Sequence, residues 1–197
     1  MPFLEDSCTF IPLTPELLST CSEFDCGHVD LNDFFKNDCV DYSSQLLGKS
    51  YCFTLDSDPS KIVCAFTISN DSVKTSDLPR GRKKAFIKQI PRVKHMRNYP
   101  AVLIGRLGVN EEFKRQKIGG ELMEFIKAWF IDGNNKTGCR FIVVDSYNEE
   151  IPLSYYSKNG FEYMFLKEEQ EKEYFGTKPT ENLSTRLMYY DLILLAQ

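Results

Sequence analysis

The stretch of residues 101–130, AVLIGRLGVNEEFKRQKIGGELMEFIKAWF, limits the possible folds more than any other part of the sequence. It begins with a nearly continuous apolar run, which is typical of a strand covered on both faces. It ends with apolar residues at helical spacing. Because the N–H groups and the dipole of a helix start attract phosphate, the basic loop and the glycines between these elements favour a phosphate site. A solvated helix start with basic residues beside it is the alternative.

The composition indicates a folded globular protein of 197 residues and 22.8 kDa, which suits one domain spanning residues 1–197. No apolar run approaches the roughly 18 residues that a membrane helix needs. The N-terminus MPFLEDSCTF is acidic and mixed, unlike a secretory signal. We therefore expect a cytoplasmic protein without a membrane partner.

Seven scattered cysteines and two histidines offer little for a metal site, because no CxxC spacing is present. A zinc site could be grouped from Cys21, Cys26, His28 and Cys39. Reduced, small apolar cysteines are the better interpretation for a cytoplasmic chain, so no metal is expected.

The net charge of −4 argues against a general nucleic-acid binder, but the charge is unevenly distributed. Residues 74–97 hold nine basic residues against a single acid, Asp77. The basic residues are Lys74, Arg80, Arg82, Lys83, Lys84, Lys88, Arg92, Lys94 and Arg97. Prolines at 79 and 91 limit this basic segment to a short helix with loops on each side. Such a run is either a solvated loop or a place where an anionic partner docks.

Hydrophobic periodicity and turn residues predict an alternating, mixed α/β chain. Thr14 and Pro15 suit the start of one helix, and Asp30 and Asp33 suit the start of another. The buried stripe of that second helix would be Leu31, Phe34, Phe35 and Val40. Further helices are expected at residues 118–130 and 150–158. Strands are expected at residues 9–13, 50–56, 61–69, 102–109, 140–146, 161–166 and 186–194.

The segment KRQKIG, residues 114–119, resembles the pyrophosphate loop of the GNAT N-acetyltransferases, Q/R-x-x-G-x-G/A. Lys114 takes the Gln/Arg position, Gly119 takes the last position, and Lys117 stands where the middle glycine is usual. The commoner phosphate loops, GxxxxGK[ST] and GxGxxG, are missing. The resemblance implies that acetyl-CoA, as co-substrate, is held by Lys114, Arg115, Gln116, Lys117, Ile118, Gly119 and Gly120.

The segment YNEEIPLSYYSKNGFE, residues 147–162, resembles the family's order of asparagine, helix, tyrosine and Gly-Phe. The resemblance implies that Asn148 contacts the pantetheine arm of the cofactor. It also implies that Tyr156 protonates the departing CoA thiolate. Without the resemblance, Tyr155 and Tyr156 would be interpreted as core aromatics before a turn.

In this family the pantetheine lies between two splayed parallel strands, which the resemblance assigns to residues 102–109 and 140–146. The backbone facing the cofactor would then be that of Leu107, Gly108 and Val109. The N–H of Val109 would stabilise the charge that develops on the thioester oxygen.

Several segments in order extend the resemblance from about residue 5 to about residue 192. FDCGHVDLNDFF, LLGKSYCFTLD, IVCAFTISNDSV and LIGRLGV resemble the toxin-like branch of the superfamily, which includes acetyltransferases of aminoacyl-tRNA. The resemblance implies an α/β GNAT fold: a central, mixed, mostly antiparallel twisted sheet with a splayed parallel strand pair and helices on both faces.

The resemblance implies acetyl transfer to a primary amine, and the α-amine of aminoacyl-tRNA is one acceptor to consider. The basic residues expected to bind it are Arg80, Arg82, Lys83 and Lys84. The general base stays open between Glu111, Glu112 and a water chain. A ribbon-helix-helix antitoxin and a second copy of the chain are the further partners suggested. The alternatives are a small-molecule or protein N-acetyltransferase, and a GNAT-fold binding module without catalysis, which the Lys117 departure favours.

Overall fold

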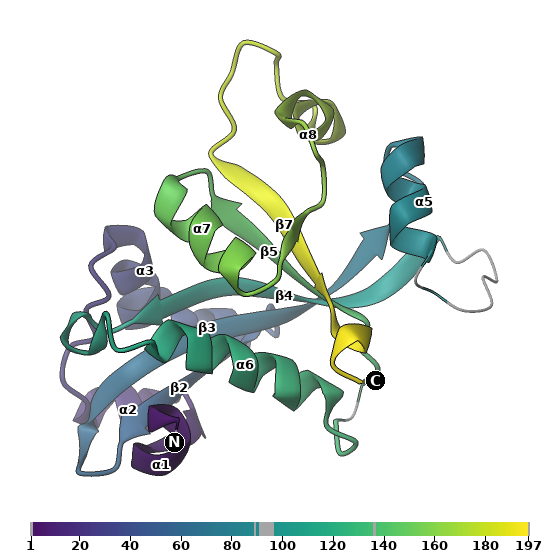
Figure 1. The fold of residues 1–197 in the computed structure, drawn as a ribbon. Coiled ribbons are helices and arrows are strands. Elements are labelled where there is room, and N and C mark those ends of the chain that lie inside the picture. The colour runs from purple at the N-terminus through teal and green to yellow at the C-terminus, as the bar shows by residue number, and fades with distance from the viewer. Residues whose placement is uncertain (1, 89, 91–96, 136, 197) are drawn as a thin grey trace. The chain divides into compact units, whose positions relative to one another are not determined.

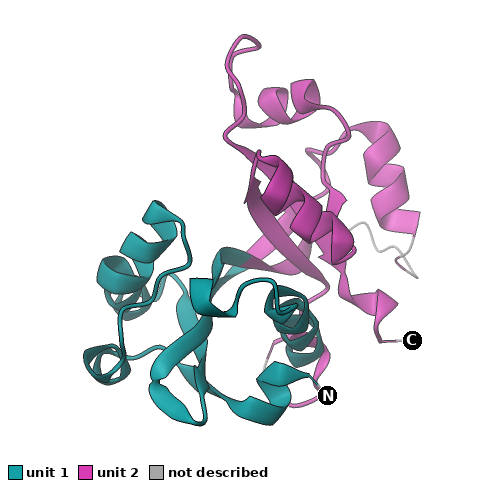
Figure 2. Ribbon diagram, turned by 60° about the vertical axis from the view of Figure 1, so that its left-hand side comes forward, with its two compact units in different colours: residues 1–70, 104–129 teal, residues 71–103, 130–197 magenta. Residues whose placement is uncertain are grey.

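The computed structural model describes residues 2–88, 90, 97–135 and 137–196, so Arg92 and Lys94 of the basic segment lie outside the described residues. The chain divides into two compact units (Figure 2). Unit 1 comprises Met1–Asn70 with Ile104–Trp129, and unit 2 comprises Asp71–Leu103 with Phe130–Gln197. The expectation of one domain stays a prediction.

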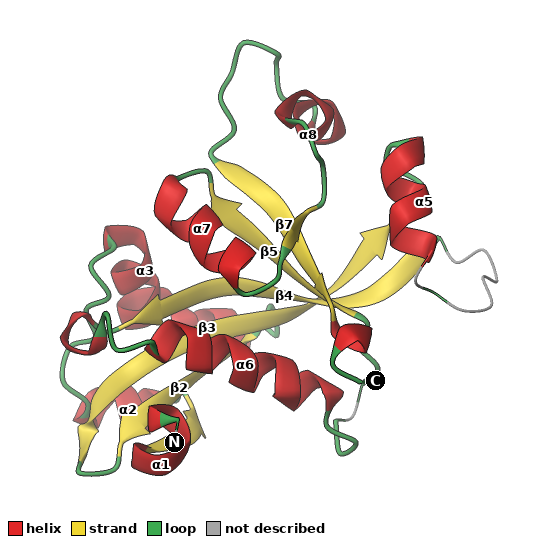
Figure 3. Cartoon of the chain, in the orientation of Figure 1, coloured by secondary structure: helices red, strands yellow, loops and turns green. Residues whose placement is uncertain are grey.

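The strands of the described chain form one seven-stranded sheet in the order β1-β2-β3-β4-β5-β7-β6 (Figures 1 and 3). The pairs β1–β2, β2–β3, β5–β7 and β6–β7 are antiparallel, and β4–β5 is the parallel pair. The strands are β1 Cys8–Pro12, β2 Lys49–Leu55, β3 Asp58–Lys74, β4 Asn98–Val109, β5 Phe141–Tyr147, β6 Glu162–Tyr163 and β7 Thr185–Asp191.

The helices include all those expected from the sequence and two that were not expected, α1 and α8. The α-helices are α1 Phe3–Ser7, α2 Pro15–Thr20, α3 Val29–Asp33, α4 Cys39–Ser44, α5 Arg80–Lys88, α6 Ile118–Ile131, α7 Glu150–Lys158 and α8 Glu168–Phe175. A π-helical turn, η1 Phe34–Asp38, joins α3 to α4, and two 3₁₀ turns are η2 Glu111–Phe113 and η3 Leu192–Leu194.

Unit 1 is held together by aromatic packing between its first strand and α6. The Phe10 ring lies 4.7 Å from that of Phe125 and 5.2 Å from that of Trp129, both in edge-on geometry. Such pairs contribute beyond the area they bury. The predicted cap of α2 is present, since the Thr14 hydroxyl accepts a hydrogen bond from the N–H of Leu17 at 3.3 Å. The helix expected to start at Asp30 instead begins at Val29, after His28.

Unit 2 has its own aromatic core. Phe86 of α5 stacks on Phe141 of β5 at 4.3 Å and lies 5.2 Å from the ring of Tyr189 in β7. The strand expected at residues 161–166 is only two residues long, because Arg82 of α5 takes the carbonyls of Tyr163 and Met164 as hydrogen-bond acceptors. The sheet edge is therefore completed by a side chain from a helix.

Helix α8 and the long loop that leads from it to β7 interrupt the β6–β7 hairpin (Figure 3). Glu171 of this helix is completely buried, with its carboxylate 2.7 Å from the Nε of Arg186 in β7. The same carboxylate accepts a hydrogen bond from the N–H of Leu187. Gly176, with φ 68°, ends the helix in the left-handed conformation that glycine tolerates best.

Candidate active site

The loop that leads into α6 has a backbone conformation unusual for its residues. Arg115 and Lys117 have φ angles of 63° and 65°, in the left-handed region that side chains with a Cβ disfavour. Lys117 is the residue standing in the place of the family's middle glycine. Its carbonyl accepts hydrogen bonds from the N–H groups of Gly120 and Glu121 at 2.9 and 3.2 Å, which closes the first turn of α6. Lys117 thus adopts the conformation that glycine would supply.

The side chains of this loop mostly face solvent. Lys114, Arg115, Gln116 and Lys117 are exposed, and Ile118 is buried and anchors the helix start in the core of unit 1. Lys114 forms an ion pair with Glu111. Among the described residues, neither Arg115 nor Lys117 forms an ion pair. Two cations are therefore available to an anion at the first turn of α6, where the helix dipole is positive.

Each of the two candidate bases forms an ion pair with a lysine of unit 1. Glu111 pairs with Lys114, and Glu112 lies 2.6 Å from the Nζ of Lys61. Both carboxylates are exposed. The choice of base stays open, as in the sequence.

Gly108 in β4 is fixed by close packing. A Cβ at this position would lie 3.0 Å from both the Cβ and the Sγ of Cys26, tighter than ordinary contact. Its neighbours Leu107 and Val109 are half-buried. Any side chain at Gly108 would therefore displace the Cys26 segment, so this glycine has a structural role whether or not it also meets a cofactor.

The segment around Cys26 is locked by a network that sequence reasoning missed. The side chain of Asn32 accepts a hydrogen bond from the Cys26 N–H at 2.8 Å and donates one to Asp25 at 2.7 Å. Asp25 also accepts from the N–H of Gly27 at 2.8 Å, and its carbonyl accepts from the N–H of Glu111. The hydrogen bonds from Gly27 and Asn32, with the charge of Lys114, lower the pKa of the Asp25 carboxyl. The motif FDCGHVDLN thus supports the η2 turn.

Tyr156 lies on α7 in unit 2 and is half-buried. Its ring packs edge-on against those of Tyr155 at 5.0 Å and Phe161 at 5.3 Å. Burial raises the pKa of the Tyr156 phenol above its ordinary value. The phenol therefore stays protonated at neutral pH, as a proton donor requires. Gly160, with φ 81°, turns the chain after α7 and brings Phe161 against Tyr190.

Asn148 follows β5 and joins it to the start of β7. Its backbone N–H donates to the carbonyl of Ser184 at 2.9 Å, and its side-chain amide donates to the carbonyl of Leu183 at 3.0 Å. A weaker contact of 3.4 Å reaches Glu168 at the start of α8. Asn148 thus fixes the loop after α8, and its contact with pantetheine stays a prediction.

The four basic residues predicted to bind substrate all lie on α5 in unit 2, but in two environments. Arg80 and Lys84 are exposed and Lys83 is half-buried. The side chain of Arg82 is only 11% exposed and pairs with Glu162 at 3.0 Å. It also lies over the ring of Tyr189, 5.2 Å from its centroid. The side chain of Arg82 is therefore engaged in contacts within unit 2.

The cysteines proposed as an alternative zinc site do not converge. Among the residues that the structure describes, no group of three or more His, Cys, Asp or Glu side chains is arranged to hold a metal ion. Burial raises the pKa of Cys39 to about 11 and also raises that of Cys26, which opposes the thiolate form that zinc needs. In the same described chain, no helix is long and apolar enough to cross a membrane.

Comparison with solved structures identifies the fold class. No protein-family model matches the sequence, and a search among curated proteins also found no match. A point mutant of KacT matches with a TM-score of 0.70 and 18% identity, over 98% of this chain and 99% of that chain. AtaT complexed with acetyl-methionyl-tRNAfMet matches with a TM-score of 0.64 and 17% identity, over 96% and 97%. AtaTR bound with AcCoA matches with a TM-score of 0.63 and 15% identity, over 98% and 99%.

The chain therefore has the GNAT fold that the sequence predicted. It shares this fold over nearly its whole length with KacT and AtaT, the toxin-like proteins of the predicted branch.

Proposed function

We propose that the chain is an acetyl-CoA-dependent N-acetyltransferase that transfers the acetyl group to a primary amine. The observation that carries this proposal is the left-handed backbone of Lys117 at the head of α6. A residue with a Cβ holds this conformation at a cost of about 1–2 kcal/mol. A left-handed residue at this point supports a turn of the kind that a glycine would form, which is what a pyrophosphate loop would need.

Two kinds of role are proposed for the site residues, namely binding of acetyl-CoA and transfer of a proton. The first turn of α6, with Arg115 and Lys117, would hold the pyrophosphate. The N–H of Val109 would donate to the thioester oxygen as negative charge develops there. Acetyl-CoA supplies the acetyl group, the amine forms the new C–N bond, and the C–S bond breaks. The proton that the amine nitrogen loses would go to the base, which stays open between Glu111, Glu112 and water. Tyr156 would donate its proton to the sulfur.

The alternative of a binding module without catalysis loses its main support. That alternative was motivated by Lys117 in the place of glycine. Lys117 adopts a φ of 65°, a backbone conformation that glycine also adopts readily, so a lysine at this position is compatible with a glycine-type turn.

The structural neighbours suggest which acceptor and partners to test. AtaT has been seen with acetyl-methionyl-tRNAfMet and, as a mutant toxin, with the C-terminus of the antitoxin AtaR. By analogy we extend the proposal to the α-amine of an aminoacyl-tRNA as acceptor and to an antitoxin partner. A small-molecule amine is the second acceptor class, because the exposed cations of α5 would serve equally as a solvated helix face.

Calorimetry with acetyl-CoA tests the proposal directly. Arg115→Glu should weaken binding by roughly tenfold or more, since it replaces an attraction to pyrophosphate by a repulsion. Lys49→Glu makes the same charge change at an exposed strand residue and should leave binding unchanged. Absence of acetyl-CoA binding at millimolar ligand would eliminate the enzyme proposal.

The role of Tyr156 is tested by comparing it with its neighbour. Tyr156→Phe should lower kcat by roughly 10²-fold and leave acetyl-CoA affinity nearly unchanged, because a proton donor acts in the transition state. Tyr155→Phe should have a much smaller effect. Equal losses from both, together with a lowered Tm, would instead assign the pair to core packing.

A further inference from the structure

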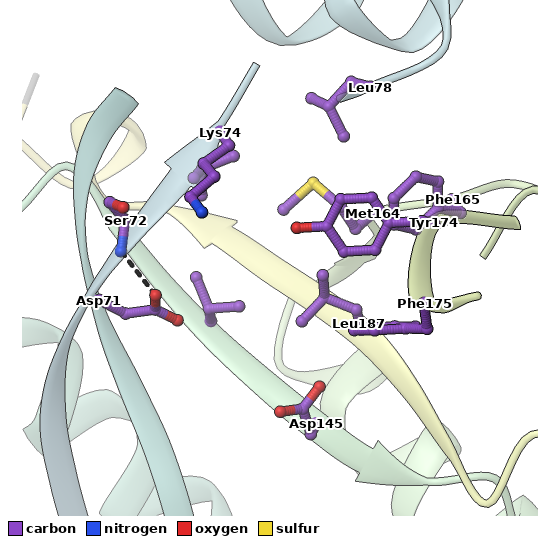
Figure 4. A pocket seen from close by; sticks show the side chains of 12 residues that line it. Asp71, Ser72, Lys74, Leu78, Asp145, Met164, Phe165, Tyr174, Phe175 and Leu187 are labelled. Atoms are coloured by element: carbon purple, nitrogen blue, oxygen red, sulfur yellow. Dashed lines mark hydrogen bonds between the residues drawn. The ribbon is translucent and has the colours of Figure 1, made fainter. Parts of the chain in front are cut away.

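A cavity of about 160 Å³ lies wholly within unit 2, on the side of β5 that carries Val143 and Asp145 (Figure 4). The end of β3, the strand β7 and helix α8 supply its other walls. Tyr156 and Asn148 do not line it, so it is separate from the residues assigned to acetyl transfer.

The floor of the cavity is apolar. Val143 and Met164 belong to the core of unit 2, and Leu187 packs against that core. The rings of Phe165 and Tyr174 form one wall, with centroids 5.0 Å apart. An apolar cavity of about 150 Å³ can hold a benzene molecule, so this space suits a compact hydrocarbon group.

The rim of the cavity is polar and carries two acids against one lysine. Asp71 and Asp145 line the cavity, and both are exposed to solvent (Figure 4). Among the described residues neither carboxylate forms an ion pair, and Asp71 accepts a hydrogen bond only from the N–H of Ser72, at 2.6 Å. Partial burial, with the negative charges of Asp71 and Glu171, raises the pKa of Asp145. Within the described chain these carboxylates therefore have no cationic partner.

Tyr174 adds to the attraction for a cation. Partial burial and the charges of Asp77, Asp71 and Asp145 raise the pKa of its phenol, so the ring stays neutral. Aromatic faces attract organic cations by roughly 0.5–2 kcal/mol. Lys74 is the only basic residue of the lining and forms no ion pair within the described chain. It therefore competes with a bound cation and leaves the acids in excess.

We propose that this cavity binds a compact organic ammonium ion, with the hydrocarbon part on the apolar floor and the NH3+ group beside Asp71 and Asp145. The combination of a partly open cavity with an apolar floor, an aromatic wall and carboxylates without an ion pair matches this ligand class. A neutral molecule would leave the carboxylates unmatched, and an anion would be repelled. The proposal concerns binding only and does not depend on acetyl transfer.

The test titrates the protein with 3-methylbutylammonium and follows binding by calorimetry and by ligand-observed NMR. The neutral isostere 3-methylbutan-1-ol and the anion 3-methylbutanoate are titrated in parallel. A charge-assisted hydrogen bond contributes about 1.5–3 kcal/mol, so the ammonium should bind at least about tenfold more tightly than the alcohol. Equal binding of the alcohol, tighter binding of the anion, or no binding of the ammonium would overturn the proposal.

Variants locate the site. Asp145→Asn should weaken ammonium binding by about tenfold or more, and Lys74→Met should strengthen it because a competing cation is removed. Glu169→Gln removes the same charge from an exposed α8 residue outside the lining and should have no effect. Asp71→Asn provides a second rim variant, and thermal unfolding confirms that each variant is folded. A loss with Glu169→Gln as large as that with Asp145→Asn would place the ligand elsewhere and overturn the proposal.

Discussion

The two basic segments of the chain look alike in sequence and differ in structure. In the loop of unit 1, Arg115 and Lys117 are exposed on a left-handed backbone and form no ion pair with a described residue. In helix α5 of unit 2, Arg82 is nearly buried and donates to the carbonyls of Tyr163 and Met164. Lys84, two residues further on, is exposed.

This difference shows that clustered basic residues can serve either to bind an anion or to stabilise the fold. The loop combines cations with the helix dipole and is arranged for an anion from outside the chain. Arg82 instead satisfies backbone acceptors where β6 ends, as the planar guanidinium can donate in several directions at once. Only the exposed members of α5 remain available to a polyanionic acceptor such as tRNA.

The largest effect on stability is expected at Arg82, where the two basic segments differ most. Arg82→Met should lower the free energy of unfolding by roughly 2–4 kcal/mol, because two backbone carbonyls and the Tyr189 hydroxyl lose their donor. Thermal or urea unfolding measures the change. Lys84→Met, on the exposed face of the same helix, should change stability by less than about 0.5 kcal/mol. Similar small losses for both variants would contradict the assignment of Arg82 to packing.

Glycine substitutions should have smaller effects on stability, and these effects should have opposite signs in the two basic segments. Lys117→Gly should stabilise the protein by about 0.5–1 kcal/mol, because glycine relieves a left-handed residue. Lys84→Gly should destabilise it by about 1 kcal/mol, because glycine is unfavourable inside a helix. Urea unfolding of both variants under one set of conditions gives the two signs. Destabilisation by both would mean that Lys117 contributes interactions that outweigh its backbone cost.

The smallest effect on stability concerns the exposed cations of α5. The double variant Arg80→Gln/Lys84→Gln should leave Tm nearly unchanged, because both side chains are exposed. If aminoacyl-tRNA is the acceptor, it should also reduce the magnitude of the slope of log affinity against log salt by roughly 0.7–0.9 for each phosphate that is no longer neutralised. Filter binding over a salt series measures that slope. Wild-type binding without salt dependence would remove tRNA from the proposal and leave a small amine.

The sequence predicted the strand–loop–helix junction well because its determinants are local. The apolar run of β4, the cations before Ile118 and the helical spacing after it lie within 30 residues. Thr14 and the break at residues 132–135 were likewise predicted from short-range capping and turn chemistry. The placement of Tyr156 on a short helix followed by a glycine turn was predicted from its spacing to Gly160.

Helix α8 and the role of Arg82 were missed because both depend on distant partners. The sequence of α8 is strongly charged and lacks an apolar stripe, yet Glu171 is completely buried. Its burial is compensated by the guanidinium of Arg186, 15 residues later, and by the N–H of Leu187. The acid-rich first turn and the glycine at its end were the available local signals. Arg82 similarly meets carbonyls about 80 residues away, which no local pattern reveals.

The left-handed residues of the basic loop also limit which substitutions this chain can tolerate there. Positions 115 and 117 need a positive φ angle, which glycine, asparagine and, at a cost, lysine or arginine can all adopt. β-Branched residues pay the highest cost there. A saturation library sorted for folded protein should therefore enrich Gly and Asn at both positions and deplete Val and Ile. Proteins whose sequences differ at these two positions would then be recognised by the φ angles of this loop more readily than by sequence comparison.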